Sequence, residues 1–416
     1  MSESLSNYAD LSREALATLL PELLLSGHLI DRSGMAHTIG AFGREGMTEV
    51  AITEWQLASP VYTRRMQRAL GFTGDTVETI FKGLQFDIGA PPQFMDFRYR
   101  LHDERHGEFW LDHCGALADV EPLGTDFVIA MCHDIEDPTF DATALATNPH
   151  AQVRPVHRPP REPADRTPVC AWTVTIDAAH IPPPVPEGAE LVAGSAAAHT
   201  RLTAIDPGEE GRGDYAGPLL SDIRFADFSR SALIRLADEV CLQHHLLTLA
   251  FAIAVRRRTD EESALDILRK QFAGIAGLTS ERLRKALGLG TDVAALIEVL
   301  RHHPAVNPLP YTGIRVEAAD DAVLLRFPRH SDAVADGAWP ALIDPEHTKA
   351  LDAMVRGVNP CFHVSETTVS DEAWTARITL ADEPAREAIE VAIAKVSTGA
   401  GFAFADRGIP LPLTVV

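Results

Sequence analysis

Apolar residues recur every three or four positions through two long parts of the chain, and alternating apolar and polar residues follow each part. The first pattern is typical of amphipathic helices and the second of half-buried strands. The helical pattern covers about 28–58 (interrupted near Gly40–Gly46), 60–86, 240–258, 262–276 and 279–302. The alternating segments are 95–103, 107–114, 151–158, 169–177, 312–318, 322–328, 361–369 and 373–382. We therefore expect an α+β protein, in which a helical half precedes an antiparallel sheet twice.

The order of these segments repeats because the sequence itself repeats. YADLSREAL at 8–16 returns as FADFSRSAL at 225–233, an offset of 217 residues. The offset falls to 211 where Asn148-Pro149 matches Asn359-Pro360, and to 202 where the AWT of 171–173 matches that of 373–375. Matches in one order over a whole half predict a tandem duplication. We expect the two copies to pack across a pseudo-two-fold axis.

The duplication divides the chain into three parts. Repeat 1 covers 1–178 and repeat 2 covers 225–416, with a Pro- and Gly-rich linker at 179–224 between them. Within the linker, AELVAGSAA is compatible with a short helix, and EPAREAIEVAIAKVS predicts a helix after the last strand of repeat 2.

Charge and composition narrow the class of protein. The formal net charge is −22, which argues against nucleic acid and anionic membranes as partners. The chain contains no P-loop and no Gly-rich dinucleotide motif, so we expect no nucleotide cofactor. Five cysteines without framework spacing, and no signal peptide, predict a cytoplasmic protein that acts on a small molecule. A homodimer is compatible with these features.

Reactive side chains are concentrated in 109–141. This stretch contains His113, Cys114, Cys132, His133, Asp134, Glu136, Asp137 and Asp141. If both His/Cys pairs lie on strands, the members of each pair point to opposite faces of the sheet, so the four do not form a zinc cage. One member of each pair can still meet the carboxylates. The alternative is that the cysteines are small core residues.

These considerations yield two sets of candidates. The candidate catalytic residues are Cys132, His133, Asp134, Cys114 and His113. The candidate ligands of a divalent metal, zinc or iron, are His113, His133, Glu136 and Asp137. The loop HRPPREPADR adds His157, Arg158 and Arg161 as candidates for binding a substrate carboxylate, because guanidinium groups bind carboxylates with two hydrogen bonds.

Repeat 2 lacks the reactive residues. By sequence, Cys114 falls on 327–330, Cys132-His133-Asp134 falls on about 343–345, and Cys170 falls on Glu372. A duplicated core would be expected to keep small apolar residues at such positions. This comparison predicts a single site in repeat 1, with Cys132-His133-Asp134 closer to the chemistry than His113-Cys114.

The layout of Cys114, Cys132 with Asp134, Asn148-Pro149 and Cys170 after a helical half resembles the L-2-amino-thiazoline-4-carboxylic acid hydrolase family. The resemblance covers about 10–178 and, without the cysteines, 225–382. It implies hydrolytic opening of a C–N or C–S bond in a small heterocycle that bears a carboxylate. Cys132 or a metal-bound water would attack, a histidine would transfer the proton, and Arg158 or Arg161 would hold the carboxylate. Two other classes stay open: a non-haem metal-dependent oxidative enzyme and a non-catalytic small-molecule-binding protein.

Overall fold

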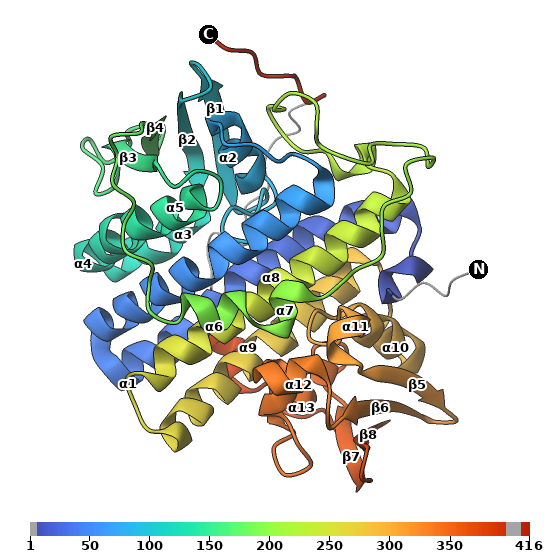
Figure 1. Cartoon of the computed structure of the whole chain (residues 1–416). Helices are drawn as coiled ribbons and strands as arrows, with labels where there is room; N and C mark the ends of the chain where they lie inside the picture. The colour runs from blue at the N-terminus through green and yellow to red at the C-terminus, as the bar shows by residue number, and fades with distance from the viewer. Residues whose placement is uncertain (1–5, 397–408) are drawn as a thin grey trace.

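Two four-stranded antiparallel sheets lie at opposite ends of the molecule, with the long helices between them (Figure 1). The computed structural model describes residues 6–396 and 409–416. The strand orders are β1-β2-β4-β3 and β5-β6-β8-β7, so the two sheets have the same topology. The strands are β1 Met95–Leu101, β2 His106–Cys114, β3 Ala151–His157, β4 Cys170–Ile176, β5 Arg315–Ala319, β6 Ala322–Pro328, β7 Phe362–Val369 and β8 Ala373–Leu380. The predicted α+β class is confirmed.

The helices of the two repeats also occur in the same order. Repeat 1 and the linker contain η1 Asn7–Asp10, α1 Arg13–Leu70, α2 Val77–Leu84, α3 Gly115–Val120, η2 Glu121–Leu123, α4 Thr125–Ile129, η3 Ala130–Ile135, α5 Glu136–Leu145, α6 Ala189–Ala193 and α7 Ala196–His199. Repeat 2 contains η4 Phe225–Asp227, α8 Arg230–Arg256, α9 Glu261–Ala286, α10 Val293–His302, α11 Leu309–Thr312, α12 Asp332–Asp336, η5 Trp339–Leu342, α13 Lys349–Arg356 and α14 Ile389–Lys395. The short helices predicted in the linker and after the last strand are both present.

Two predicted helix breaks are wrong, and one is correct. α1 changes direction at Gly43, whose φ of 71° only glycine adopts easily, as the interruption near Gly40–Gly46 predicted. The breaks expected near residues 59 and 277–278 do not exist. Gly277 is not a helix end: a Cβ there would lie 2.6 Å from Val391, so this glycine allows α14 to approach α9. The helices instead end next to Gly71 and Gly288, which both have positive φ.

Equivalent contacts across the centre of the molecule show the pseudo-two-fold relation. Nε of Arg13 donates to the carbonyl of Phe228 at 2.6 Å, and Nε of Arg230 donates to the carbonyl of Leu11 at 2.9 Å. The donors and the acceptors of these two bonds are each 217 residues apart. The predicted duplication is therefore visible in the contacts as well as in the sequence.

Two ion pairs repeat the same relation. Arg65 bonds Glu239 at 2.8 Å, and Arg282 bonds Glu22 at 2.7 Å, again at an offset of 217. Both pairs link a helix of one repeat to a helix of the other. The interface between the repeats is therefore built from two copies of one set of contacts.

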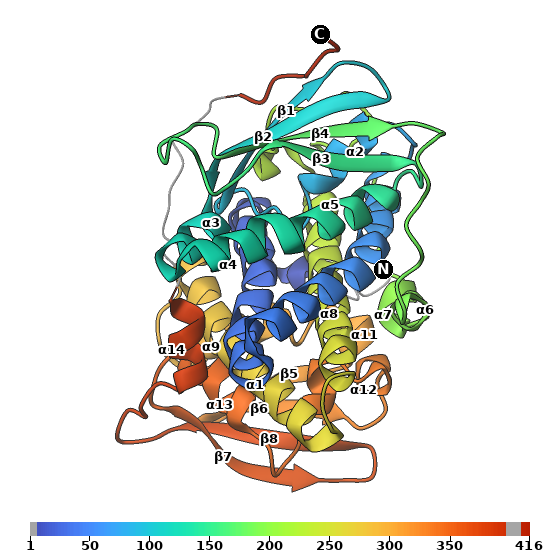
Figure 2. The same cartoon turned by 90° about the vertical axis from the view of Figure 1, so that its left-hand side faces the viewer.

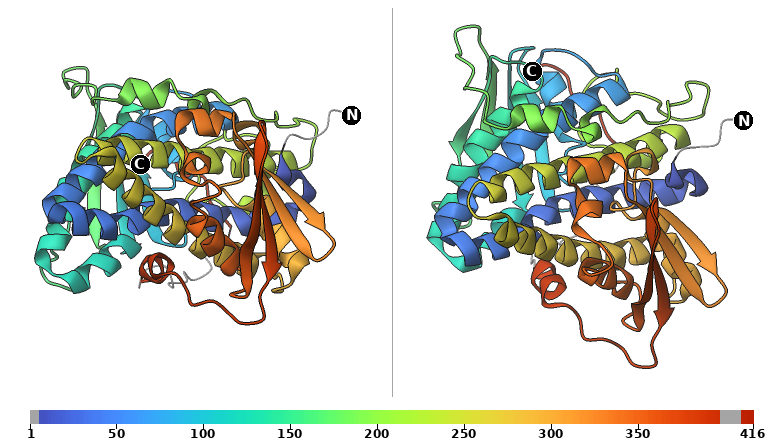
Figure 3. Two further views of the ribbon diagram at one scale, coloured as in Figure 1. Left: turned by 90° about the horizontal axis from the view of Figure 1, so that it is seen from below. Right: turned by 60° about the horizontal axis from the view of Figure 1, so that its bottom comes forward.

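The elements form layers, which Figure 2 shows from the side. The first sheet is followed by α3, α4 and α5, then by the central helices α1, α8 and α9, then by α13 and the second sheet. Figure 3 shows the same central helices between the two sheets from below. One continuous apolar core runs through these layers. Within 6–396 and 409–416, none of the helices combines the length and the apolar character needed to cross a membrane.

Candidate functional site

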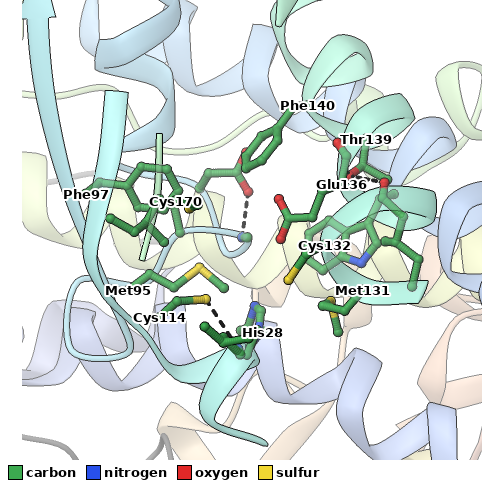
Figure 4. Close-up of a pocket in the computed structure, with 18 of the residues that line it drawn as sticks. His28, Met95, Phe97, Cys114, Met131, Cys132, Glu136, Thr139, Phe140 and Cys170 are labelled. Atoms are coloured by element: carbon green, nitrogen blue, oxygen red, sulfur yellow. Dashed lines mark hydrogen bonds between the residues drawn. The ribbon is translucent and has the colours of Figure 1, made fainter. Parts of the chain in front are cut away.

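A cavity lies in repeat 1, between α1, the first sheet and the helices that follow β2 (Figure 4). The space open to the centre of a water-sized sphere is about 90 Å³. A single water needs roughly 10–15 Å³ on this measure, so the cavity has room for several waters or a small ligand. Its walls are mostly apolar, with thiol, carboxyl, imidazole and guanidinium groups among them.

Three cysteine side chains line this cavity, each from a different element. Cys114 ends β2, Cys132 lies in η3, and Cys170 begins β4. The sheet brings two of them together, because Leu111 of β2 pairs with Cys170, three residues before Cys114. Figure 4 shows the sulfur atoms of Cys114 and Cys132 on either side of His28. Three thiols that are distant in sequence therefore face one cavity.

Cys132 and His133 lie on a helix, not on a strand end as the sequence analysis assumed. Residues 125–145 are helical throughout, and 130–135 form a π-helical turn. Such turns are rare and occur frequently at functional sites. Successive helical residues point in different directions, so Cys132 faces the cavity while Nε2 of His133 donates to the carbonyl of Pro159 at 2.7 Å. Cys132 and His133 therefore point apart, as predicted, but they do so because they lie on a helix and not on a strand.

Burial controls protonation in this part of the site. It raises the pKa of Cys114 to about 12, and it raises the pKa values of Cys132 and Cys170 well above the usual range. Burial also raises the pKa of Glu136 to about 8, with Asp137 adding to the rise and Arg158 opposing it. At neutral pH the thiols therefore keep their hydrogens, and the carboxyl group of Glu136 titrates just above neutrality.

The wall formed by α1 and the segment before β1 is acidic, and the sequence analysis missed it. Asp31 and Asp87 line the cavity, and burial raises the pKa of each to about 6. The hydroxyl of Tyr62 donates to Oδ1 of Asp87 at 2.8 Å. Trp55 and His28 complete this wall. The available signal for Asp31 was its place at the end of the mostly apolar run LLPELLLSGHLID, on the helical spacing of buried residues.

The loop 158–169, which we call the cavity loop, borders one side of the cavity through Arg158 and Pro159. Arg158 forms an ion pair with Asp137, and its guanidinium group lies 5.7 Å from the ring of Trp172. Arg161 bonds Glu121 at 3.0 Å. In repeat 2 only three residues, 370–372, join the corresponding strands. The offset change from 211 to 202 is therefore an insertion beside the cavity.

The predicted site residues separate into two groups. Cys114, Cys132, Glu136 and Arg158 line the cavity; His113, His133, Asp134, Asp137, His157 and Arg161 are not among its lining residues. His113 lies on β2, where burial lowers its pKa and the negative charge of Asp96 opposes this shift. Asp134 is exposed to solvent. Nε2 of His157 donates to the carbonyl of Pro168 at 3.0 Å.

The metal hypothesis depends on ligands that converge. Across residues 6–396 and 409–416, no three His, Cys, Asp or Glu side chains are grouped so that they could hold a metal ion. The predicted ligands His113, His133, Glu136 and Asp137 therefore do not form such a group, and we assign no chemical step to a metal.

Repeat 2 has almost no cavity at the equivalent place. Its space is about 10 Å³, and its lining is entirely apolar, including Phe272, Phe327 and Ile343. Trp339, which is 1% exposed, stacks on Phe272 with 5.1 Å between ring centroids. Phe272 corresponds to Trp55 at the offset of 217. Large side chains thus fill the space that repeat 1 leaves open.

The structure also corrects the counterpart of Cys114. Sγ of Cys114 accepts from the backbone N–H of Leu117 at 3.4 Å, and Oγ of Ser331 accepts from that of Val334 at 3.3 Å. Both residues thus cap the helix that follows the hairpin. The counterpart is Ser331, and the match to 327–330 was wrong because Phe327 occupies the place of Phe109, each opposite a tryptophan of the next strand.

Comparison of the chain with protein-family models, with curated proteins and with solved structures gave no match.

Proposed function

We propose that the repeat 1 cavity is the active site of a small-molecule hydrolase, which opens a C–N or C–S bond of a small carboxylate-bearing heterocycle. The main support is that one cavity holds three thiols and Glu136, whereas the same place in repeat 2 has neither the reactive groups nor the space. The resemblance to L-2-amino-thiazoline-4-carboxylic acid hydrolases is part of this proposal and supplies the substrate class.

Cys132 and Glu136 are the groups to which we assign the chemistry. Sγ of Cys132 forms a bond to the ring carbon that carries nitrogen and sulfur, and its hydrogen passes to the carboxylate of Glu136 in the fraction of molecules in which that group is ionised. Glu136 then donates that proton to the ring heteroatom as the bond between it and the carbon breaks. Water attacks the thioester-like carbon and restores the thiol. One water is consumed, and no oxidant or reductant is needed.

Arg158 is the residue that we assign to the substrate carboxylate. It lines the cavity, and its side chain is 18% exposed, so it is accessible to a ligand there. A carboxylate would compete with Asp137 for the guanidinium group, which can hold two oxygens at once. Arg161 and His157 do not line the cavity, so we assign them the positioning of the cavity loop instead.

Hydrolysis of 2-amino-thiazoline-4-carboxylate, followed by mass spectrometry of the ring-opened product, tests this function. Cys132→Ala and Glu136→Gln should each lower kcat by roughly 10²–10⁴-fold. Cys361→Ala, which alters a half-buried cysteine of repeat 2, is the matched control and should stay within about twofold of the parent. Full activity of Cys132→Ala would disprove the assigned nucleophile.

A non-catalytic binding protein is the second candidate. It is favoured by the raised pKa values of the three thiols, which keep them protonated and unreactive in the absence of a ligand. In that case 2-amino-thiazoline-4-carboxylate would bind, and it would be recovered unchanged after prolonged incubation. The five cysteines are free thiols, which supports a reducing cytoplasmic location under either candidate.

A further inference from the structure

The acidic wall of the cavity contains more carboxyl groups than cations. Asp31 and Asp87 are 7% and 4% exposed, and Glu54, which is fully buried, lies beside Asp31. The two arginines that line the cavity already have carboxylate partners: Arg32 bonds Asp119 at 2.5 Å, and Arg158 pairs with Asp137.

In the part of the chain that the structure describes, no basic side chain is in ion-pair contact with Asp31 or Asp87. The charge of Arg32 acts on Asp31, but Arg32 itself is bonded to Asp119. Buried carboxylates without a cation are costly, and such groups take up protons instead. The raised pKa values of Asp31 and Asp87 agree with this state. A cation that enters the cavity would supply the missing charge.

His28 provides an independent indication of a ligand in the same wall. It lines the cavity, is 8% exposed, and its Nδ1 atom has no hydrogen-bond partner. The ring bonds the backbone of Ile88, and burial lowers the pKa of His28 to about 3, so the imidazole is neutral. A neutral ring whose other nitrogen donates to a carbonyl has a lone pair on Nδ1. Nothing in the described part of the chain donates a hydrogen bond to this buried nitrogen of the cavity wall.

Two aromatic rings, those of His28 and Trp55, lie beside the carboxyl groups of this wall. The rings of His28 and Trp55 lie 6.3 Å apart, and a Cβ at Gly89 would be 3.3 Å from the Trp55 ring and 3.1 Å from Oδ1 of Asp87. The indole ring and a carboxylate therefore border the same small volume. The carboxylate attracts a cation through its charge, and an indole does so where the cation meets its face.

We infer that this wall is the binding site for the cationic part of the ligand, a small amidinium or primary ammonium group. Asp31 and Asp87 supply the negative charge, and Nδ1 of His28 accepts an N–H hydrogen. This inference rests on the proposed function and deepens it: with Arg158 holding a carboxylate, the cavity would select a zwitterion. Repeat 2 has Thr248 in place of Asp31 and Pro304 in place of Asp87, so it lacks this wall.

Binding of acetamidine and acetamide, measured by isothermal titration calorimetry at neutral pH, tests the inference. The two molecules have nearly the same shape, but only acetamidine is a cation. Acetamidine should bind at least about tenfold more tightly than acetamide. Asp31→Asn and Asp87→Asn should each weaken acetamidine binding by about tenfold and leave acetamide binding unchanged.

Asp238→Asn is the matched control, because Asp238 is a buried carboxyl group of α8 that does not line the cavity. It should bind acetamidine like the parent chain. Equal affinity for acetamidine and acetamide, or unchanged acetamidine binding by a folded Asp87→Asn variant, would overturn the inference. If Asp31→Asn does not fold, Asp87→Asn decides the question alone.

The same experiment separates this inference from the proposed hydrolase. Acetamidine contains no ring to open, so its affinity is independent of turnover. Cys132→Ala should bind acetamidine as tightly as the parent chain even where it no longer hydrolyses 2-amino-thiazoline-4-carboxylate. Cation binding without hydrolysis would support the acidic wall and contradict the catalytic proposal.

Discussion

The two repeats have the same topology, yet among the described residues the space between helices and sheet is open in repeat 1 and almost closed at the equivalent place in repeat 2. In repeat 1 that space measures about 90 Å³ and is bordered by thiols and carboxyl groups. In repeat 2 it measures about 10 Å³ and is bordered by apolar side chains. A duplicated fold can therefore keep its backbone while one copy fills a space with apolar side chains and the other leaves that space open and lines it with thiols and carboxyl groups. The difference lies in a few side chains and one inserted loop.

The largest expected effect concerns the side chain that fills repeat 2. Trp339→Ala should lower the free energy of unfolding by about 3–5 kcal/mol, because it removes a fully buried indole that stacks on Phe272. Urea denaturation measures this change. Trp110→Ala, which removes a half-buried ring of the first sheet, is the control and should cost clearly less. Equal costs would mean that Trp339 does not support the packing of repeat 2.

The two symmetry-related ion pairs should differ in strength. Arg65 and Glu239 are 6% and 2% exposed, whereas Arg282 and Glu22 are 20% and 21% exposed. Arg65→Ala leaves Glu239 with Arg235 as its remaining partner, and it leaves the carbonyls of Ala198 and Thr200 without their donor. We therefore expect a cost of about 2–3 kcal/mol. Arg282→Ala should cost about 1 kcal/mol or less, because water can solvate Glu22. Chemical denaturation of both variants gives the comparison, and similar losses would contradict the role of burial.

A smaller difference is expected for the matched histidines His28 and His245. Nε2 of His245 bonds the carbonyls of Pro304 and Asn307 at 3.2 and 2.9 Å, whereas the ring of His28 bonds the backbone of Ile88 alone. Nδ1 has no hydrogen-bond partner in either ring. His245→Leu should cost about 1–3 kcal/mol because it leaves two buried carbonyls unpaired. His28→Leu should cost less, about 1 kcal/mol, because it removes one backbone hydrogen bond instead of two. A larger loss for His28→Leu in urea denaturation would reverse this part of the comparison.

The cost of His245→Leu should also depend on pH. Burial lowers the pKa of His245 to about 4, below its value of about 6.5 in the unfolded chain. The neutral ring therefore contributes stability above pH 6.5 that is lost as the pH falls toward 4. Leucine does not titrate, so the difference between the two proteins should shrink by at most about 1.4 kcal/mol per pH unit below 6.5. Denaturation at pH 7 and pH 5 checks this, and a constant difference would contradict it.

Much of the fold could be predicted from local patterns. Period-two alternation identified all eight strands, and the repeat of 217 residues anticipated the two equal sheets and the relation between them. The break at 277–278 was wrong because Gly277 allows close packing and does not end the helix, and the break near residue 59 was wrong because α1 continues through Pro60.

The candidate site was only partly predictable. Cys114, Cys132 and Glu136 were identified because they are unusual residues close together in sequence and absent from repeat 2. Asp31 and Asp87 were missed, since one aspartate on a helix and one in a loop resemble ordinary surface residues until their burial is known. His113 and His133 were chosen for their neighbours in sequence, but the directions of their side chains separate them from the cavity.

The sequence by itself determined the order of helices and strands, the duplication, and which repeat carries the reactive residues. These properties depend on periodicity and on residue identity, which are local. The tertiary structure decided that side chains as far apart in the sequence as His28 and Trp172 border one cavity. It also decided that Trp339 and Phe272 fill the matching space in repeat 2. That outcome depends on how side chains of given volume fit between packed layers, and close packing is a property of the whole fold.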